Sequence, residues 1–401
     1  MLKWIRNRLV GYEVFFRREE RWVLELVTDD EDAAIAEARR ALSTGKTPAA
    51  RVVRQRSMMS GFTTETIVFE EAAAAPAEKP VVVHSPPVPT PVCRTVGEMF
   101  EAAGRRTVGL SLREYLARND LTVTELMHSW SHIRRFQDKA EILTACIHRI
   151  ASAQATTTGE PVKPRVGALL GLVDEATTLA RDFQVERKKL PHYDGSDIVA
   201  YDRIIRGLVG DDRYPYVIRA MLSVWLFDIR SLNGKLEAVL HMLRADGVDN
   251  RLAAILDGFA ADTLIFADVI QELFGARGCL GEFLCLLADL LQGRAPVVEG
   301  VSPLLTDLAL HFRDDRVPDC VAILTDRLVQ ELTADRPLDK LNPAREGHQI
   351  EVLSKALSLP DGSLFGGEVV RKAMSSRRLR HRQSVLRAQG LHHIADNLRL
   401  D

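Results

Sequence analysis

Apolar and polar residues alternate along the first part of the chain. In residues 12–16 and 22–26 every second side chain is apolar, and the polar tripeptide at 18–20 separates the two segments. Side chains at alternate positions of a strand lie on one face of a sheet. The pattern therefore predicts two strands joined as a hairpin.

The spacing of apolar residues becomes helical between residues 29 and 45. Two aspartates open this segment, where a helix favours an N-cap and acidic side chains, and a glycine closes it. Alternation returns near residues 50–56 and 63–70. The sequence therefore predicts a small α+β module of ββαββ order in residues 1–71.

Residues 72–92 form a different kind of segment, rich in proline, alanine and valine, with six prolines. Each proline fixes φ and lacks an N–H donor, which excludes a regular helix or a central strand. We therefore expect a semi-rigid linker that separates the ββαββ module from the rest of the chain.

Apolar residues recur at intervals of three and four over most of the remaining chain. Residues 166–183 and 317–332 keep this spacing over several turns, as amphipathic helices do. The segments 111–114 and 122–125 have the residue order of capping boxes, which predicts that a helix begins at each. Glycines and prolines separate the segments, and we expect about eight to eleven helices.

The predicted fold class is mainly α, with a small N-terminal α+β (ββαββ) module, a proline-rich linker and a large helical bundle. We assign a helical segment to residues 93–160 and the bundle, which ends in a basic helix, to residues 161–401. A threonine-rich stretch at residues 156–164 marks the expected boundary. The sequence leaves open whether these helices form one domain or two.

Composition places the chain among proteins that fold around a sizeable core. Hydrophobic residues make up 46% and charged residues 27% of the 401 positions, and the formal net charge is -2. Cations interrupt the apolar residues of the N-terminal segment, unlike in a signal peptide. No uncharged apolar run has the roughly 18 residues that a membrane span needs. We expect a cytoplasmic protein without a transmembrane segment.

The sequence offers no motif that specifies a reaction. The five cysteines are an odd number spread along the chain, which does not indicate a disulfide framework. Gly45-Lys46-Thr47 ends like a phosphate-binding loop, but it follows a helix and precedes a proline, whereas such a loop leads from a strand into a helix. No cofactor is indicated, and the sequence favours a protein that is not an enzyme.

A polar and aromatic region between residues 192 and 216 is the first candidate site. Tyrosines combine apolar area with a hydrogen-bonding group, and loops beside a short helix are common binding sites. The histidine of this region could act as an acid or base with a nearby aspartate. Alternatively, the aspartates cap helices and the tyrosines pack helix ends. The candidate ligand-binding residues are His192, Tyr193, Asp194, Asp197, Tyr201, Asp211 and Tyr214.

Glu125, His128 and His132 make a second candidate, for a metal ion. On one continuous helix, spacings of three and four place them on the same side, and paired histidines can ligate a transition metal. The neighbouring apolar residues define the buried face, so we expect both histidines on the solvent side. The capping box already explains Glu125, and an exposed helix face is the favoured interpretation.

The C-terminal segment is strongly basic. Residues 371–401 contain eight lysines or arginines and two aspartates, a net charge of +6. Cations interrupt the apolar face of the helix expected there. The segment therefore faces water, docks on an acidic surface of this chain or of a protein partner, or contacts nucleic acid or an anionic membrane. The candidate partner-binding residues are Arg377, Arg378, Arg380, His381 and Arg382.

Two classes of function remain, and a third is weaker. The first is a non-catalytic adaptor or regulatory protein that binds macromolecular partners, chiefly protein, through the N-terminal module and the helical domain. The second is a helical protein or enzyme that binds a small molecule or a metal near residues 192–216. The third is nucleic-acid association through the basic segment, which lacks the aromatic residues that stack on single strands. The sequence indicates no oligomeric state.

Overall fold

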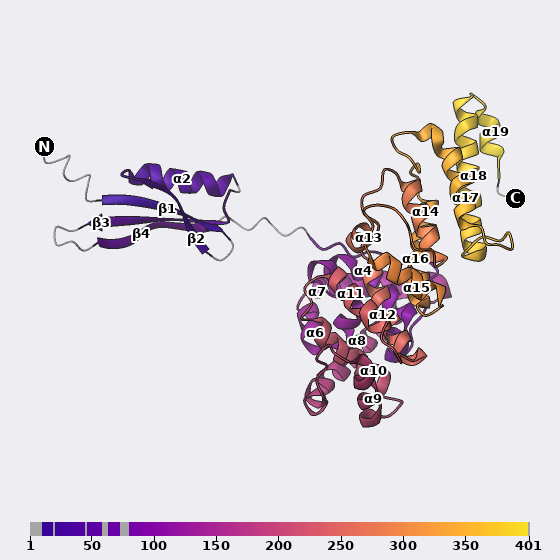
Figure 1. The fold of residues 1–401 in the computed structure, drawn as a ribbon, viewed down its shortest axis with the longest axis horizontal. Helices are drawn as coiled ribbons and strands as arrows, with labels where there is room; N and C mark the ends of the chain where they lie inside the picture. The colour runs from indigo at the N-terminus through magenta and orange to yellow at the C-terminus, as the bar shows by residue number, and fades with distance from the viewer. Residues whose placement is uncertain (1–9, 19–20, 45, 58–62, 73–79, 400–401) are drawn as a thin grey trace. The chain divides into compact units, whose positions relative to one another are not determined.

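A computed structural model gives the fold of the chain (Figure 1). The chain divides into two compact units, Met1–Pro80 and Val81–Asp401. The residues that the structure describes are 10–18, 21–44, 46–57, 63–72 and 80–399.

The N-terminal unit is a four-stranded antiparallel sheet with one helix on one face (Figure 1). The strand order is β2-β1-β3-β4, so β2 and β4 are the edges. This arrangement confirms the predicted ββαββ module, while the expected turn residues 19–20 and the glycine at 45 lie outside the described residues. The elements are β1 (Val10–Arg18), β2 (Arg21–Thr28), α2 (Glu31–Ser43), β3 (Ala49–Ser57) and β4 (Thr63–Ala72).

Helix α2 packs on the sheet through the face predicted from the alternating pattern of β1. Val14 and Phe16 of that strand are 0% and 1% exposed. Ala34, Ala38 and Ala41 recur at helical spacing on the facing side of α2 and are equally buried. Burial of these side chains gives the module a hydrophobic core of its own.

The second half of the predicted linker lies against the helical unit. Val83 is buried, and the backbone N–H of Thr90 donates to the hydroxyl of Thr157 (2.9 Å). Residues 81–92 therefore belong to the second compact unit, whereas 73–79 lie outside the described residues. An extended proline-rich chain cannot pair with itself, so side chains of the helices satisfy some of its backbone groups.

The second unit is mainly helical, in agreement with the predicted fold class. Two short 3-10 helices, at Arg187–Lys189 and Pro343–Arg345, supplement its α-helices. These are α3 (Val96–Phe100), α4 (Ala102–Arg118), α5 (Val123–His128), α6 (Trp130–Gln137), α7 (Ala140–Thr158), α8 (Val162–Glu186), α9 (Ile198–Val209), α10 (Tyr214–Leu226), α11 (Leu232–Leu243), α12 (Asn250–Leu264), α13 (Ala267–Phe274), α14 (Leu280–Leu291), α15 (Leu304–Arg313), α16 (Pro318–Thr333), α17 (Glu346–Leu357), α18 (Gly367–Ala388) and α19 (His392–Asn397).

The described part of this unit contains seventeen α-helices, α3 to α19, more than the eight to eleven expected. Several amphipathic stretches break into shorter helices at a single residue. Glu101 separates α3 from α4, and Ser129 separates α5 from α6, both with extended backbone angles. The apolar periodicity continues across such breaks, so it does not reveal them.

The two predicted capping boxes have different outcomes. Thr122 and Glu125 form a complete box at the start of α5, as expected. Ser111 instead lies inside α4, where its hydroxyl donates to the carbonyl of Thr107 (2.9 Å). The prediction of a helix start at Ser111 is wrong because a serine inside a helix can bond to the carbonyl four residues earlier.

One hydrophobic core runs through the second unit from α3 to α18. The predicted segment 93–160 and the predicted bundle 161–401 both contribute to it, so they share a core. Helices α9 and α10 lie at one end of this unit, and α17 and α18 pack together at the other (Figure 1). Among the described helices, none combines the length and the apolar composition needed to cross a bilayer.

Helix α16 is held at both ends by side chains from other helices. At its N-terminus the Asp257 carboxylate of α12 accepts the backbone N–H groups of Asp319 (2.7 Å) and Cys320 (3.1 Å). At its C-terminus Arg377 and Arg380 of α18 donate to the last carbonyls of the helix. These contacts satisfy backbone groups that have no partner within the helix.

Arg377 has a further role beside α16. It is 3% exposed, and its guanidinium forms an ion pair with Glu346 at the start of α17 (2.9 Å). It also donates to the carbonyl of Arg336 (2.6 Å) in the loop that leaves α16. One side chain therefore joins α16, α17 and α18.

Replacing Arg377 with leucine leaves Glu346 without its partner and the carbonyls of α16 unpaired. We expect the free energy of unfolding, measured by urea denaturation followed by circular dichroism, to fall by about 3–5 kcal/mol. Arg382→Leu, at an exposed position of the same helix, is the control and should change stability by less than about 0.5 kcal/mol. Equal losses for the two variants would contradict the role inferred for Arg377.

Candidate functional site

Charged side chains are buried at several places in the helical unit. A buried charge is costly unless a partner neutralises it, so each such residue marks a structural or functional constraint. The described charged residues buried around α4, α5, α11 and α12 are Arg105, Glu125, Lys235, Asp257 and Asp262.

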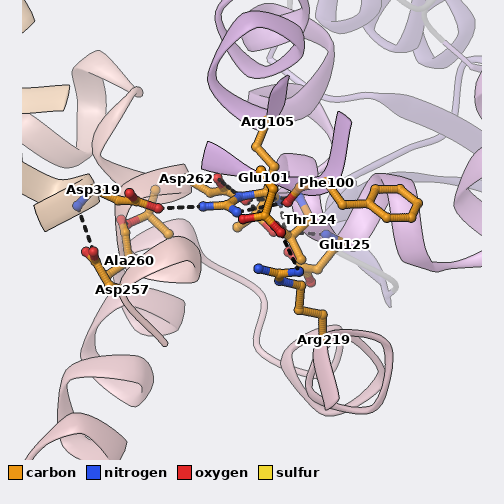
Figure 2. Close-up of polar contacts among 12 residues, drawn as sticks. Phe100, Glu101, Arg105, Thr124, Glu125, Arg219, Asp257, Ala260, Asp262 and Asp319 are labelled. Atoms are coloured by element: carbon orange, nitrogen blue, oxygen red, sulfur yellow. Dashed lines mark hydrogen bonds and ion pairs between the residues drawn. The ribbon is translucent and has the colours of Figure 1, made fainter. Parts of the chain in front are cut away.

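Arg105 of α4 joins helices that are distant in sequence. Its guanidinium donates to Asp262 of α12 (3.2 Å) and to Asp319 of α16 (2.9 Å), and Figure 2 shows it between the two carboxylates. The second oxygen of Asp262 accepts the backbone N–H (3.0 Å) and the hydroxyl (2.6 Å) of Thr124 in α5. Both buried charges are thus paired and hydrogen-bonded, which is the condition for burying them.

The cluster continues on both sides of Arg105 (Figure 2). On one side, burial raises the pKa of Asp257 to about 6, although the two N–H groups that it accepts favour its charged form. On the other side, a carboxylate oxygen of Glu101 lies 3.8 Å from the guanidinium of Arg219. Burial lowers the pKa of Arg219, because its charged form is less well solvated there.

A second buried ion pair joins α5 to α11. The Lys235 ammonium donates to the Glu125 carboxylate (2.6 Å) and to the carbonyl of Asp120 (2.6 Å). The other Glu125 oxygen accepts the backbone N–H of Thr122 (2.8 Å) in the capping box. Burial raises the pKa of Glu125, and Lys235 opposes that rise. Glu125 therefore has a structural task beyond the cap predicted for it.

Within each of these two clusters, the charged side chains pair with one another. A cavity of about 200 Å³ lies beside Arg105 and Asp262, but its other walls are mainly apolar. Among the described residues, no group of three His, Cys, Asp or Glu side chains is placed to hold a metal ion. The arrangement is suited to locking helices together, whereas acid-base chemistry needs a group that can reach a substrate.

The structure corrects the placement of His128 and His132. We expected them on the solvent side of one helix, but they are 3% and 5% exposed. The helix is broken at Ser129, so the two histidines belong to α5 and α6. The spacing rule applies within one continuous helix, which is why it fails here.

Both histidines nevertheless line one cavity of about 260 Å³. It lies at the junction of α5 and α6, beside the ends of α8 and α10. Phe183, Phe227 and Trp130 form apolar walls, while serine hydroxyls and the two imidazoles supply polar groups. The ring of His132 packs on that of Phe227, with 4.9 Å between their centroids.

Both imidazoles are neutral at pH 7. Burial lowers the pKa of His128 to about 3 and that of His132 to about 4. His128 Nδ1 donates to the carbonyl of Thr124 (2.8 Å), so the proton is on Nδ1 and Nε2 is an acceptor. That Nε2 atom is buried and has no hydrogen-bond partner among the described residues. Leaving such an acceptor unpaired costs about 1–3 kcal/mol.

The aspartates of the first candidate site bind within their own segment or to a neighbouring helix. Asp197 is the N-cap of α9, and Asp194 accepts a backbone N–H and a hydroxyl from the turn that follows it. Asp211 forms an ion pair with Arg251 of α12. His192 is exposed, and among the described residues no hydrogen bond joins it to either nearby aspartate. The acid-base pair considered from the sequence is therefore not formed in this structure.

The tyrosines of that site pack between helices. Tyr193 is 2% exposed, and its ring lies 5.0 Å from that of Tyr201 and 5.3 Å from that of Trp225. The Tyr214 hydroxyl donates to a carboxylate of α9. These contacts agree with the alternative interpretation, in which the aspartates cap helices and the tyrosines pack helix ends. Ligand binding by this region stays a prediction.

Some of the basic side chains of the C-terminal segment bind to neighbouring helices of the same unit. Besides Arg377 and Arg380, which contact α16, Arg378 donates to the hydroxyl of Ser354 in α17 (2.7 Å). His381 is half-buried, and Arg382 is exposed. The intramolecular docking considered from the sequence is thus present, and partner binding by the remaining surface stays a prediction.

The N-terminal sheet presents an apolar edge strand. Val23, Leu24, Leu26 and Val27 of β2 are 37%, 47%, 40% and 58% exposed. On the opposite edge, β4, Ile67 is 51% exposed, and the strand also contains the exposed residues Glu65, Glu70 and Glu71. Within the described sheet β2 is an edge strand, and an edge with exposed apolar side chains is a typical place for another strand to add.

Sequence reasoning missed the buried ionic clusters, although a signal for them exists. Lys235 lies in the largely apolar stretch 232–243, and Asp257 and Asp262 lie in the similar stretch 252–266. A charged residue on the apolar face of a predicted helix must find a partner when that face is buried. The partner itself cannot be read from spacing, because it comes from a distant helix.

Comparison of the chain with known protein families, curated proteins and solved structures gives no match. The geometry of the chain defines a two-unit protein. One unit is an α+β module with an exposed apolar edge strand, and the other is a helical unit with a partly polar cavity.

The buried neutral histidines make stability depend on pH. Their pKa in the folded protein lies below the ordinary 6.5, so stability that is present above pH 6.5 is lost as the pH falls toward about 3 for His128 and 4 for His132. Each histidine should lower the free energy of unfolding by about 2 kcal/mol between pH 7 and pH 5.

His132→Gln tests this expectation in urea denaturation at both pH values. The stability difference between wild type and variant should shrink by about 2 kcal/mol from pH 7 to pH 5. Carboxyl groups with a raised pKa, such as Asp257, affect both proteins alike and cancel. A difference that does not change with pH would contradict a low pKa for His132.

Lys235→Met tests the ion pair with Glu125. We expect a loss of about 3–5 kcal/mol in the free energy of unfolding, because Glu125 stays buried without its partner. Adding Glu125→Gln removes the unpaired charge and should restore part of the loss. Urea denaturation of the two variants measures both effects, and a double variant less stable than Lys235→Met would argue against a stranded charge.

Proposed function

We propose that the protein is a non-catalytic adaptor or regulatory protein that binds a protein partner through its N-terminal module. The partner adds an extended strand to β2, the apolar edge of the sheet. The helical unit is the second half of the adaptor, and the proline-rich segment connects the two.

The exposed apolar residues of β2 carry this proposal. Sheet edges are normally protected by charges, prolines or short strands, because an open edge presents unpaired backbone groups. The eight residues of β2 include only two charged ones, Arg21 and Glu25. Val23 and Leu24 are neighbours in the strand, so their exposed side chains lie on opposite faces. An added strand would therefore bury apolar surface on both faces.

The pairing of the buried charges with one another also supports a non-catalytic role for the protein. The Arg105 cluster and the pair of Glu125 with Lys235 connect helices through their mutual contacts. A general acid or base must instead be able to reach the proton that it transfers. These clusters therefore favour a rigid scaffold.

Association with nucleic acid through the basic segment receives less support. Arg377 and Arg380 donate to backbone carbonyls at the end of α16, and Arg378 donates to Ser354. Cations with partners inside the chain are less available for phosphate groups, which supply most of the affinity in non-specific binding.

Leu24→Lys places a charge in the middle of β2 and leaves the core of the module intact, because Leu24 is 47% exposed. In affinity capture with the full-length protein, we expect the variant to bind the protein partner of the wild type at least about tenfold more weakly. Sedimentation equilibrium measures self-association in parallel, since a second copy can also supply the added strand.

Ile67→Lys, at a 51% exposed position of the opposite edge, is the matched control and should bind like the wild type. Equal capture by wild type and Leu24→Lys would exclude β2 as the binding edge. So would a loss of binding in Ile67→Lys as large as that in Leu24→Lys.

A further inference from the structure

The cavity at the junction of α5 and α6 has no part in strand addition to the N-terminal sheet. Its volume is about 260 Å³. An engineered apolar cavity of about 150 Å³ admits benzene. The cavity therefore has room for a fused or substituted aromatic ring.

The walls of this cavity suit a flat apolar molecule. Phe183 of α8 is 4% exposed and lies deep in the wall, whereas Phe227 after α10 is 50% exposed. Trp130 of α6 and Ala180 of α8 add apolar surface. Aromatic rings favour offset or edge-to-face contact with such side chains, which contributes beyond the apolar area alone.

One buried acceptor in the cavity wall has no donor among the described residues. Nε2 of His128 is a buried acceptor without a partner, and no hydrogen bond joins the ring of His132 to another described residue. A buried acceptor of this kind calls for a donor from a bound molecule.

The charges of the residues that line the cavity favour an uncharged ligand. Both imidazoles are neutral at pH 7, since burial lowers the pKa of His128 to about 3 and that of His132 to about 4. Arg187 and Asp228 line the same cavity with opposite charges, and neither belongs to an ion pair among the described residues. Their charges sum to zero, so the cavity has no net charge that would favour an anion or a cation.

A metal ion is the competing occupant, because neutral imidazoles are also good ligands for transition metals. Only His128 and His132 are available, and no group of three His, Cys, Asp or Glu side chains within the described residues could complete the coordination. Two protein ligands fall short of the three or four that zinc sites use. The aromatic side chains of the walls, in contrast, can pack directly against the ring of a ligand.

We propose that this cavity binds a small, uncharged aromatic molecule that carries a ring N–H or O–H group. The ring lies among Phe183, Trp130 and Phe227, and its donor faces the imidazole acceptors at the junction of α5 and α6. The protein would then sense or carry such a molecule in its helical unit, in addition to binding a partner through the N-terminal module.

Isothermal titration calorimetry of the full-length protein with three probes tests the proposal. Indole has a ring N–H, 1-methylindole lacks it, and 3-methylindole keeps it at the larger size. Indole and 3-methylindole should bind saturably with similar affinity, and 1-methylindole should bind at least about tenfold more weakly, because an acceptor would remain unpaired.

Two variants locate the binding. His128→Phe keeps an aromatic ring but removes the unpaired Nε2 acceptor, and it should abolish the preference for indole over 1-methylindole. Phe227→Ala, at a half-exposed position, should weaken all three probes without affecting the fold. Val185→Ala, at a 67% exposed position of α8 outside the cavity wall, is the control and should bind like the wild type.

Several outcomes would overturn the proposal. Equal affinity for indole and 1-methylindole would remove the role of the acceptors. No heat of binding from any of the three probes at millimolar concentration would remove the site, as would binding that neither His128→Phe nor Phe227→Ala changes. Tight binding of Zn²⁺ that His128→Phe abolishes, in a protein that ignores indole, would replace the aromatic ligand with a metal.

Discussion

The two ends of helix α16 set the constraint on which the helical unit depends. Every helix ends in backbone groups without intrahelical partners, and side chains of other helices can bond to them. Asp257 of α12 satisfies the N-terminus, and Arg377 and Arg380 of α18 satisfy the C-terminus. Segments that are distant in the sequence therefore supply the hydrogen bonds at both ends of this one helix.

Buried charges connect α16 to α5 in the same way, through partners that are distant in the sequence. Asp319 of α16 shares the guanidinium of Arg105 with Asp262, and Asp262 in turn binds Thr124 of α5. Lys235 fixes α5 from its other side through Glu125. This short helix ends in His128, so the clusters that hold α5 also fix the position of the cavity wall. Ion pairs that take no part in binding thus shape the candidate binding site.

The two units offer different kinds of recognition. The N-terminal module presents backbone groups and apolar side chains along β2, which suits an extended protein segment. The helical unit has a partly open cavity with aromatic walls and neutral acceptors, which suits a small molecule. A protein that holds both can link the presence of a small ligand to the binding of a partner, provided that one site changes the free energy of the other.

The sequence by itself determined the local elements, because alternation, helical spacing and caps depend on neighbours along the chain. It predicted the ββαββ module, the long helices and the capping box at Thr122. Tertiary structure decided what depends on distant partners or on one-residue breaks. It placed Ser111 inside α4, buried His128 and His132 across the break at Ser129, and turned Arg377 inward. A buried charge becomes tolerable only when a remote residue pairs with it, and spacing along one helix carries no information about that residue.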